Sequence, residues 1–185
     1  MIRELAMRLH VRQIREYYRA RKEDSVLEVG CNRGLLLDLL GRLGGPTYGV
    51  DVDHTVVDRA GQKGHTVCVC NAENLAFPDR SFDALFSIHT IEHVGDLSKA
   101  MGEFSRVLKP GGTLVLVYPY EPVVGITCVP FWSLSKNGNV HLRALKPRDV
   151  VGIIRERRLD LAPVHSRMYP VLTPNYVSVF RKRSG

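Results

Sequence analysis

A glycine-rich turn that follows an apolar run is the first feature of this sequence that could do chemistry. Residues 26–29 read Val-Leu-Glu-Val, and residues 30–34 read Gly-Cys-Asn-Arg-Gly before the apolar stretch 35–40. Glycine lets a ligand approach the backbone closely, and the amides that open the following helix can receive the ligand's polar groups. A tight connection without a ligand has a similar composition, so the turn by itself only indicates a nucleotide-type site.

An acidic residue ends the next apolar run. Asp51 follows Tyr48-Gly49-Val50 and comes about twenty residues after the first turn, the spacing at which nucleotide-binding folds hydrogen-bond ribose hydroxyls. Asp53 stands immediately before a helical pattern and is better placed to cap that helix. We therefore expect Asp51 to bind the ribose of a nucleotide-type ligand.

Ionisable side chains gather in the segment Ser-Ile-His-Thr-Ile-Glu-His-Val at residues 87–94. This segment follows an apolar run, and parallel strands bring such ends to the edge of the sheet where ligands bind. Histidine titrates near neutral pH, so His89 and His93 are candidate general bases, and His141 ranks beside His89. His89, Glu92 and His93 could instead hold a divalent metal, but a structural His93 is the simpler interpretation and we predict no metal.

Short apolar runs that alternate with amphipathic segments must position these residues, a pattern typical of an α/β fold with a parallel sheet. Strands are predicted at residues 25–30, 47–51, 66–70, 82–87, 113–118, 161–167 and 176–181. Helices are predicted at residues 2–22, 34–43, 55–61, 97–108 and 147–157, with Pro147 suited to a first helical turn. Residues 109–113 are expected to form a polar turn before a buried strand, and residues 119–143 an irregular segment longer than a connection requires.

Four sequence motifs, in this order along the chain, resemble those of the class I S-adenosylmethionine-dependent methyltransferases, in particular their small-molecule and lipid-type, methyltransferase type 11-like members. The motifs are residues 28–34, 49–51, 71–83 and 108–114. The resemblance covers residues 24–116 and implies a Rossmann-like, doubly wound, mostly parallel seven-stranded sheet that binds S-adenosylmethionine and releases S-adenosylhomocysteine. It implies one domain over residues 1–185. That domain divides into an N-terminal helix (1–23), a cofactor-binding core (24–118), an acceptor-side lid segment (119–143) and a C-terminal helix with strands (144–185).

The resemblance also implies roles for single residues. Glu28 would receive the ammonium of the methionine part, Asp51 would hold the ribose, and Asn71 with Ala72 would meet the adenine edge. The implied cofactor contacts are Glu28, Gly30, Cys31, Asn32, Gly34, Asp51, Val52, Asn71, Ala72, Glu73 and His89. Asn32 stands where the family usually has glycine. Asparagine tolerates the left-handed backbone better than other non-glycine residues, and Asn32 breaks the three-glycine fingerprint of dehydrogenases.

Composition leaves the acceptor open. The chain has 185 residues, a formal net charge of +7 and four cysteines without metal-finger spacing. The residues near Met1 lack the apolar run of a signal peptide or membrane span, so we expect a cytoplasmic protein with reduced thiols. The basic helix at residues 2–22 has three interpretations: a helix packed on the sheet, a cover over the cofactor, or a peripheral contact with anionic lipid.

The function we expect is methyl transfer from S-adenosylmethionine to a small-molecule or lipid-like acceptor, at oxygen, nitrogen or carbon. A cofactor-binding regulatory protein without catalysis is one alternative, because Asn32 departs from the family pattern. A nucleic-acid methyltransferase is another, because the chain is basic. The absence of an Asn-Pro-Pro-Tyr or Asp-Pro-Pro-Tyr signature after the fourth predicted strand argues against nucleic acid. The oligomeric state stays open.

Overall fold

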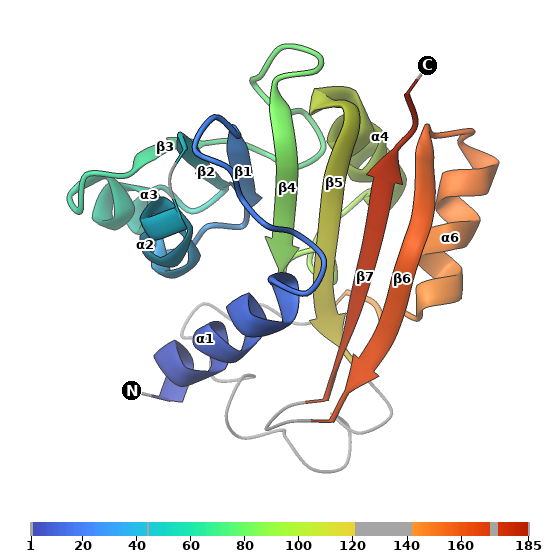
Figure 1. Ribbon diagram of the computed structural model, residues 1–185, viewed down its shortest axis with the longest axis horizontal. Coiled ribbons are helices and arrows are strands. Elements are labelled where there is room, and N and C mark those ends of the chain that lie inside the picture. Colours follow the sequence, from blue (N-terminus) through green and yellow to red (C-terminus); the bar gives the residue numbers. More distant parts are fainter. Residues whose placement is uncertain (1, 44, 121–141, 171–173, 185) are drawn as a thin grey trace.

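The computed structural model of the chain describes residues 2–43, 45–120, 142–170 and 174–184, which form one seven-stranded sheet (Figure 1). The strands are β1 (Val26–Val29), β2 (Thr47–Asp51), β3 (Thr66–Val69), β4 (Phe82–Ile88), β5 (Leu108–Pro119), β6 (Leu161–Tyr169) and β7 (Asn175–Lys182). Their order across the sheet is β3-β2-β1-β4-β5-β7-β6, and β7 runs in the direction opposite to the other six strands. The predicted mostly parallel, doubly wound sheet is confirmed.

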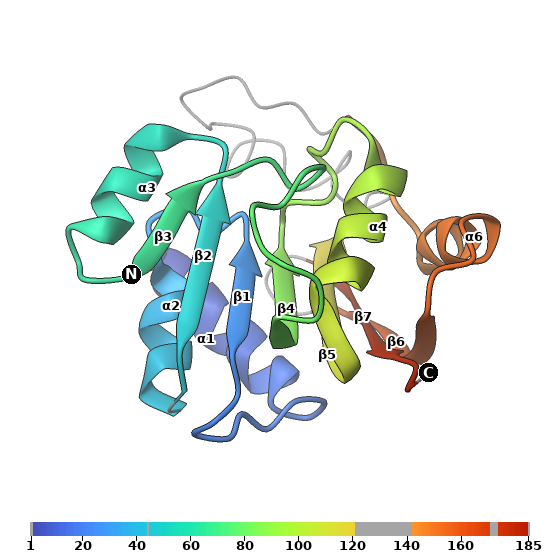
Figure 2. The same ribbon diagram turned by 90° about the horizontal axis from the view of Figure 1, so that it is seen from above.

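Helices cover both faces of the sheet (Figures 1 and 2). The helices are α1 (Ile2–Ile14), α2 (Leu35–Leu40), α3 (His54–Gly61), α4 (Leu97–Val107) and α6 (Pro147–Glu156). Successive residues of β5 feed two separate cores, because side chains alternate between the faces of a strand. Val115 packs in the cluster that α1 and α2 cover, whereas Leu114 packs in the cluster that α4 and α6 cover.

Three predicted helix starts are set by local chemistry that the sequence carries. The Asp53 carboxylate accepts a hydrogen bond from the Thr55 amide at 2.8 Å, so Asp53 caps α3 as expected. Asp96 caps α4 through the Lys99 amide in the same way. Pro147 occupies the first turn of α6, as predicted.

The predicted length of the N-terminal helix is wrong, because α1 ends at Ile14 instead of continuing to residue 22. Tertiary contacts hold the tyrosines that suggested a longer helix. The Tyr17 ring stacks on His165 of β6, with ring centroids 4.6 Å apart, and the Tyr18 hydroxyl donates to Asp24 at 2.7 Å. Among the described residues, no helix has the length and apolar character needed to cross a bilayer.

The start of β5 also differs from the prediction. The strand begins at Leu108, which pairs with Phe82 of β4, and the register then jumps so that Ala84 faces Thr113. The expected polar turn is therefore a bulge inside the strand. Gly111 lies at φ 77° within it, a left-handed conformation that favours glycine.

Smaller differences concern element ends. The predicted helix at residues 34–43 is split into α2 and a short 3-10 turn at Gly41–Leu43. β6 and β7 are longer than predicted, because each pairs with the other along its whole length.

Candidate functional site

The first four strands end at one edge of the sheet, because β3, β2, β1 and β4 are parallel. This edge therefore gathers the turn after β1, Asp51 at the end of β2, residues 70–74 after β3 and residues 89–93 after β4. These are the segments that the sequence analysis selected, and open α/β sheets bind ligands at such an edge.

The turn after β1 has a left-handed backbone at three positions, Gly30 (φ 81°), Asn32 (φ 47°) and Gly34 (φ 73°). A Cβ atom on Gly30 would overlap the Thr90 side chain, so a larger residue does not fit there. Asn32 adopts the conformation that the sequence analysis expected it to tolerate.

The amides of the turn itself, at residues 30–34, are already bonded within the chain. The amides of Gly30 and Cys31 donate to the Val50 carbonyl at 2.8 and 2.9 Å. The Asn32 amide donates to Asp51 Oδ2 at 2.9 Å, the Arg33 amide to the side chain of Asn32 at 2.9 Å, and the Gly34 amide to the Cys31 carbonyl at 2.9 Å. The turn therefore offers a ligand its shape and the acids beside it, rather than free N–H groups.

Glu28 places a buried carboxylate under this turn. Its side chain is 3% exposed, and its Oε2 atom has no hydrogen-bond partner among the described residues. Burial, and then the negative charge of Asp51, hold the pKa of Glu28 well above its ordinary value. A cationic ligand would supply the missing partner and favour the ionised form, so Glu28 fits the ammonium of S-adenosylmethionine.

Asp51 and Val52 lie beside the turn at the end of β2. Asp51 Oδ2 accepts from the Asn32 amide and Oδ1 accepts from the Asp53 amide at 3.1 Å, so the half-buried carboxylate is held in one orientation. Two oxygens fixed in this way can still accept from a pair of hydroxyls. The Val52 side chain is 68% exposed and offers apolar surface next to that carboxylate.

Residues 71–74, after β3, form a tight turn in which the Asn74 amide donates to the Asn71 carbonyl at 3.0 Å. Asn71 is exposed, and its Oδ1 atom accepts from the Glu73 amide at 2.9 Å, whereas Ala72 is buried. The Glu73 carboxylate accepts from the Asp96 amide at 3.0 Å and so ties this turn to the start of α4. Asn71 and Ala72 can meet a ligand here, and the Glu73 carboxylate has a structural partner.

Cys31 lies within the site, but its thiol faces inward. The side chain is 2% exposed, and a Cβ atom on Gly49 would lie 2.9 Å from the sulfur. Burial, with Glu28 next in importance, raises the pKa of Cys31. The thiol is thus an unreactive packing group.

Three ionisable side chains meet on the acceptor side. The Nδ1 atom of His89 lies 3.5 Å from Oε1 of Glu92, which is 1% exposed. The ring of His10, from α1, lies 5.4 Å from the His89 ring. Burial, and then the nearby His89, lower the pKa of His10 to about 4, so His10 is neutral at pH 7.

His10 was not among the residues predicted for the site, although the sequence carries a signal for it. His10 stands four residues before the buried Ile14, so both belong to the apolar face of α1. His93 is half-buried, its amide donates to the Thr90 carbonyl at 2.9 Å, and it has a further interaction within the chain. His141 lies outside the described residues.

The metal alternative finds no support in the geometry. Across residues 2–43, 45–120, 142–170 and 174–184, no three His, Cys, Asp or Glu side chains are grouped as metal ligands. His89 and Glu92 approach each other, but His93 does not complete a set with them.

Comparison with known proteins gives a consistent result. A family model described as a methyltransferase domain matches residues 27–116. A ubiquinone biosynthesis O-methyltransferase of Bartonella tribocorum is 26% identical over 149 residues, 74% of this chain and 60% of that protein. A probable tRNA methyltransferase 9B of Mus musculus is 34% identical over 108 residues, 56% of this chain and 24% of that protein. The chain thus spans 60% or less of these two relatives.

The fold has a solved counterpart of nearly the same length. It is the putative methyltransferase of Haloferax volcanii, solved in complex with the Trm112 methyltransferase activator. The TM-score is 0.81 at 16% identity, and the match covers 99% of this chain and 94% of that one. The fold and the sequence match over residues 27–116 both support a class I S-adenosylmethionine-dependent methyltransferase domain.

Proposed function

We propose that this chain transfers the methyl group of S-adenosylmethionine to a small-molecule or lipid-like acceptor. The observation that carries the proposal is the pair of carboxylates on either side of the glycine turn, Glu28 with an unpartnered buried oxygen and Asp51 with two oriented oxygens. A ligand that has both an ammonium and vicinal hydroxyls would satisfy both groups at once. The 26% identity to a ubiquinone biosynthesis O-methyltransferase supports a small-molecule acceptor.

The described residues divide the proposed work between them. Glu28 binds the ammonium, Asp51 binds the ribose hydroxyls, and Val52 and Ala72 pack against the adenine while Asn71 bonds its edge. When bound, S-adenosylmethionine supplies a methyl group on a positively charged sulfur. The chain's contribution is to hold an acceptor in line with that methyl group and to exclude water, which can account for much of the rate.

The acceptor side remains a set of proposals. His89, which is 28% exposed, is the base for an acceptor that carries a proton, and His93 and His141 are further candidates. Residues 119–143 are proposed as the lid, and all but four of them lie outside the described residues. α1 covers the site, since it brings His10 against His89. Its buried side packs on the sheet, so the proposed cytoplasmic location needs no lipid contact.

Two measurements on the purified chain test the proposal. Calorimetric titration with S-adenosylhomocysteine should give one binding site, and no heat of binding would contradict a cofactor role. Incubation with S-adenosylmethionine and a panel of phenols, amines, carboxylates and quinols should form S-adenosylhomocysteine with at least one class. Binding without turnover across the whole panel would favour the alternative of a regulatory protein.

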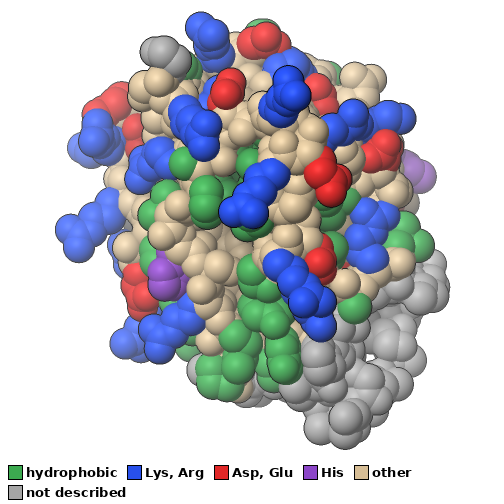
Figure 3. All heavy atoms as spheres, turned by 90° about the vertical axis from the view of Figure 1, so that its right-hand side faces the viewer, with side chains coloured by type: hydrophobic (Ala, Val, Ile, Leu, Met, Phe, Trp, Pro, Cys, Tyr) green, Lys and Arg blue, Asp and Glu red, His purple; other side chains and the backbone are tan. Residues whose placement is uncertain are grey.

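An RNA acceptor is the second candidate, because one side of the molecule is strongly basic. Residues 144–185 contain nine lysines and arginines against three acidic residues, whereas residues 24–118 contain eight against twelve. Figure 3 shows the side that α6 and β6 occupy, where blue Lys and Arg side chains surround green hydrophobic surface. The identity to a probable tRNA methyltransferase supports this candidate.

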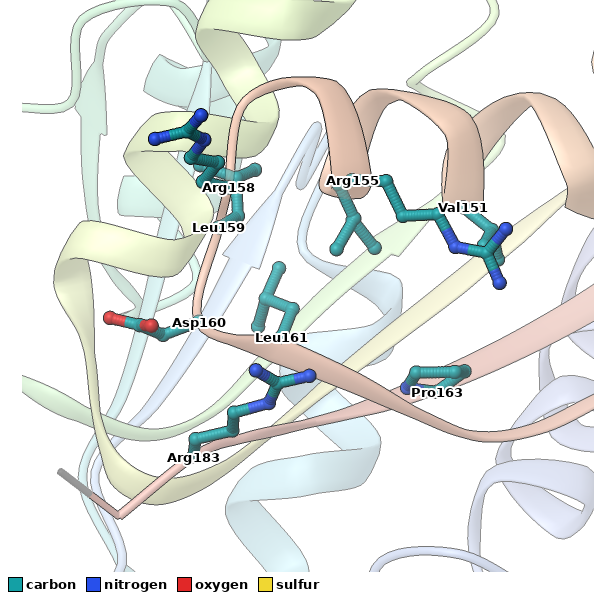
Figure 4. A pocket seen from close by; sticks show the side chains of 9 residues that line it. Val151, Arg155, Arg158, Leu159, Asp160, Leu161, Pro163 and Arg183 are labelled. Carbon is teal, nitrogen blue, oxygen red and sulfur yellow. The ribbon is translucent and has the colours of Figure 1, made fainter.

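A hollow on this basic side could receive an anionic ligand. Its volume is about 420 Å³, and it is lined in part by Arg155, Arg158 and Arg183 around Leu161. Within the described chain none of these arginines forms an ion pair, and in Figure 4 the carboxylate of Asp160 points away from Arg155 and Arg183. Guanidinium groups around an apolar floor suit a phosphate with a base beside it.

A further inference from the structure

The second half of the glycine turn, Arg33 and Gly34, is held by side chains from a distant part of the chain. The first half is bonded to β2, through the Val50 carbonyl and the Asp51 carboxylate. α2 starts directly after Gly34, and no side chain caps that start with a hydrogen bond. Because the turn offers a ligand mainly its shape, the groups that hold this second half matter for how well a ligand fits.

Lys63 and His65 lie in the connection between α3 and β3, where both of their amides donate to the Ala60 carbonyl, at 3.1 and 3.3 Å. The Lys63 ammonium donates to the Arg33 carbonyl at 2.8 Å and lies 3.3 Å from Asp38 Oδ2. The Lys63 and Asp38 side chains are 44% and 36% exposed, and exposed ion pairs contribute little to stability. The Lys63 contact is therefore the weaker of the two.

The His65 ring lies directly over Gly34. A Cβ atom on Gly34 would lie 2.6 Å from His65 Cδ2 and 3.0 Å from Nε2, so the ring fills the space that a side chain would need there. His65 Nε2 lies 2.8 Å from Asp38 Oδ1, and the ring nitrogen is the donor because a carboxylate only accepts. The Asp38 amide in turn donates to the Gly34 carbonyl at 2.9 Å. The ring is thus fixed between Gly34 and the helix that follows it.

Gly34 needs such an external constraint, because glycine reaches more backbone conformations than any other residue. Its φ angle is 73°, in the left-handed region. Apart from His65, the residue nearest to the position of a Cβ on Gly34 is Ala60, whose Cβ lies 3.4 Å away, an ordinary contact distance. A turn that samples several conformations binds its ligand more weakly, in proportion to the fraction of time that it spends in the competent one.

We propose that His65, supported by Asp38 and Lys63, is a positioning residue that keeps the glycine turn in the shape that receives S-adenosylmethionine. This role rests on the proposed function, because the ligand of the turn is part of that proposal. His65 acts through Gly34 and through the start of α2, and it needs no contact with the ligand. Its effect is to order the turn before the ligand arrives, so that binding does not have to supply that order.

Hydrogen exchange of the ligand-free chain, followed by NMR, tests whether His65 holds the turn. The Gly34 amide donates to the Cys31 carbonyl at 2.9 Å, and His65→Ala should speed its exchange by about fivefold or more through local opening. His65→Gln keeps an N–H donor on a side chain of similar reach and should restore part of the protection. Gln62→Ala, an exposed change in the same connection, should exchange like wild type. Unchanged exchange in His65→Ala would overturn the proposal.

Calorimetric titration with S-adenosylhomocysteine separates positioning from stability. His65→Ala should raise Kd by about fivefold to tenfold, whereas a merely structural contact would lower the free energy of unfolding and leave Kd unchanged. Asp38→Ala places a good helix former at a half-buried position, so this variant should fold. Because Asp38 acts through the His65 ring, the double variant should bind no more weakly than His65→Ala.

The outcomes of these measurements are distinct. An unchanged Kd in His65→Ala, or additive losses in the double variant, would overturn the positioning role. A wild-type chain that binds no S-adenosylhomocysteine would instead contradict the proposed function, and hydrogen exchange would still decide whether His65 holds the turn.

Discussion

At the scale of single residues, the site depends on acids whose partners lie in the backbone or are missing. Asp51 is held by two amides, which orient its oxygens, whereas Glu28 has an oxygen that nothing in the described chain satisfies. We propose different roles for the two acids: Asp51, whose oxygens are oriented, would fix the position of a ligand, and Glu28, whose oxygen lacks a partner, would attract the ligand's positive charge.

Asp51→Ala should weaken S-adenosylhomocysteine binding by more than about tenfold, because it removes the acceptors proposed for the ribose hydroxyls. Calorimetry on the purified variant measures this effect. Asp58→Ala is the matched control, since it removes an exposed acid from α3 with the same change of charge. Equal affinities of Asp51→Ala and wild type would show that the ribose assignment is wrong.

Gly30→Ala should lower the free energy of unfolding by about 2–4 kcal/mol, since it adds both backbone strain and an overlap with Thr90. Gly64→Ala separates the two causes. Gly64 also has a positive φ angle, 88°, but a Cβ atom there would meet no neighbour within 4 Å. Urea denaturation should therefore show a clearly smaller loss for Gly64→Ala, and equal losses would contradict the packing argument.

At the scale of elements, α4 holds the loop that follows the adenine-side turn. The Arg106 guanidinium donates to the carbonyls of Leu75 and Phe77 at 3.0 and 2.8 Å and to the Glu103 carboxylate. Glu103 in turn accepts from the Leu75 amide at 2.7 Å. One helix thus fixes both ends of a short loop that would otherwise lack regular pairing.

Hydrogen bonds from Arg106 hold the pKa of Glu103 below its usual range, and this shift makes the loop contact pH-dependent. A depressed folded-state pKa gives stability that is present above the ordinary carboxyl pKa and is lost as the pH falls through the lower value. Glu103→Gln should therefore cost about 1–2 kcal/mol at pH 7 and progressively less below about pH 4. Urea denaturation at pH 7, 5 and 3 measures this, with Glu156→Gln as control. A loss independent of pH would contradict it.

Elements with a strong local signal were predictable, and their ends often were not. β2, the cap at Asp53 and the start of α6 at Pro147 depend on neighbouring residues, and the structure matches the prediction there. α1 continues only to Ile14 because Tyr17 stacks on a residue of β6. The spacing of apolar residues along the sequence cannot predict such a long-range contact. The β5 bulge has the same origin, since only pairing with β4 decides where that strand begins.

At the scale of the whole molecule, parallel topology explains how the sequence alone could place the proposed site residues at one edge of the sheet. Strand ends that carry polar residues must meet at one edge, so Glu28, Asp51 and His89 could be brought together from the sequence. What could not be foreseen is how these groups are satisfied. The occupied amides of the turn depend on β2 and on backbone angles, and the approach of His10 depends on where α1 packs.

The uneven charge of the molecule yields a last prediction, which discriminates between the two acceptor classes. Arg155, Arg158 and Arg183 line a hollow near the start of β6, at the opposite edge of the sheet from the candidate site. An RNA acceptor held there would lose one phosphate contact for each arginine removed. The triple change to glutamine should then reduce the slope of log affinity against log salt by about three.

Filter binding of tRNA at several salt concentrations measures this slope. The control changes Arg12, Arg42 and Arg59 to glutamine, which removes the same charge from exposed positions on other elements. If the chain acts on RNA, the first variant should lose affinity for tRNA and the second should keep most of it. The reason is that RNA would bind at the hollow itself, whereas both variants lose the same net charge. Equal losses would mean nonspecific attraction only. If both variants turn over a small acceptor at the same rate, the hollow has no role in binding that acceptor. This result is expected for a small acceptor, since the acids and His89 lie at the far edge.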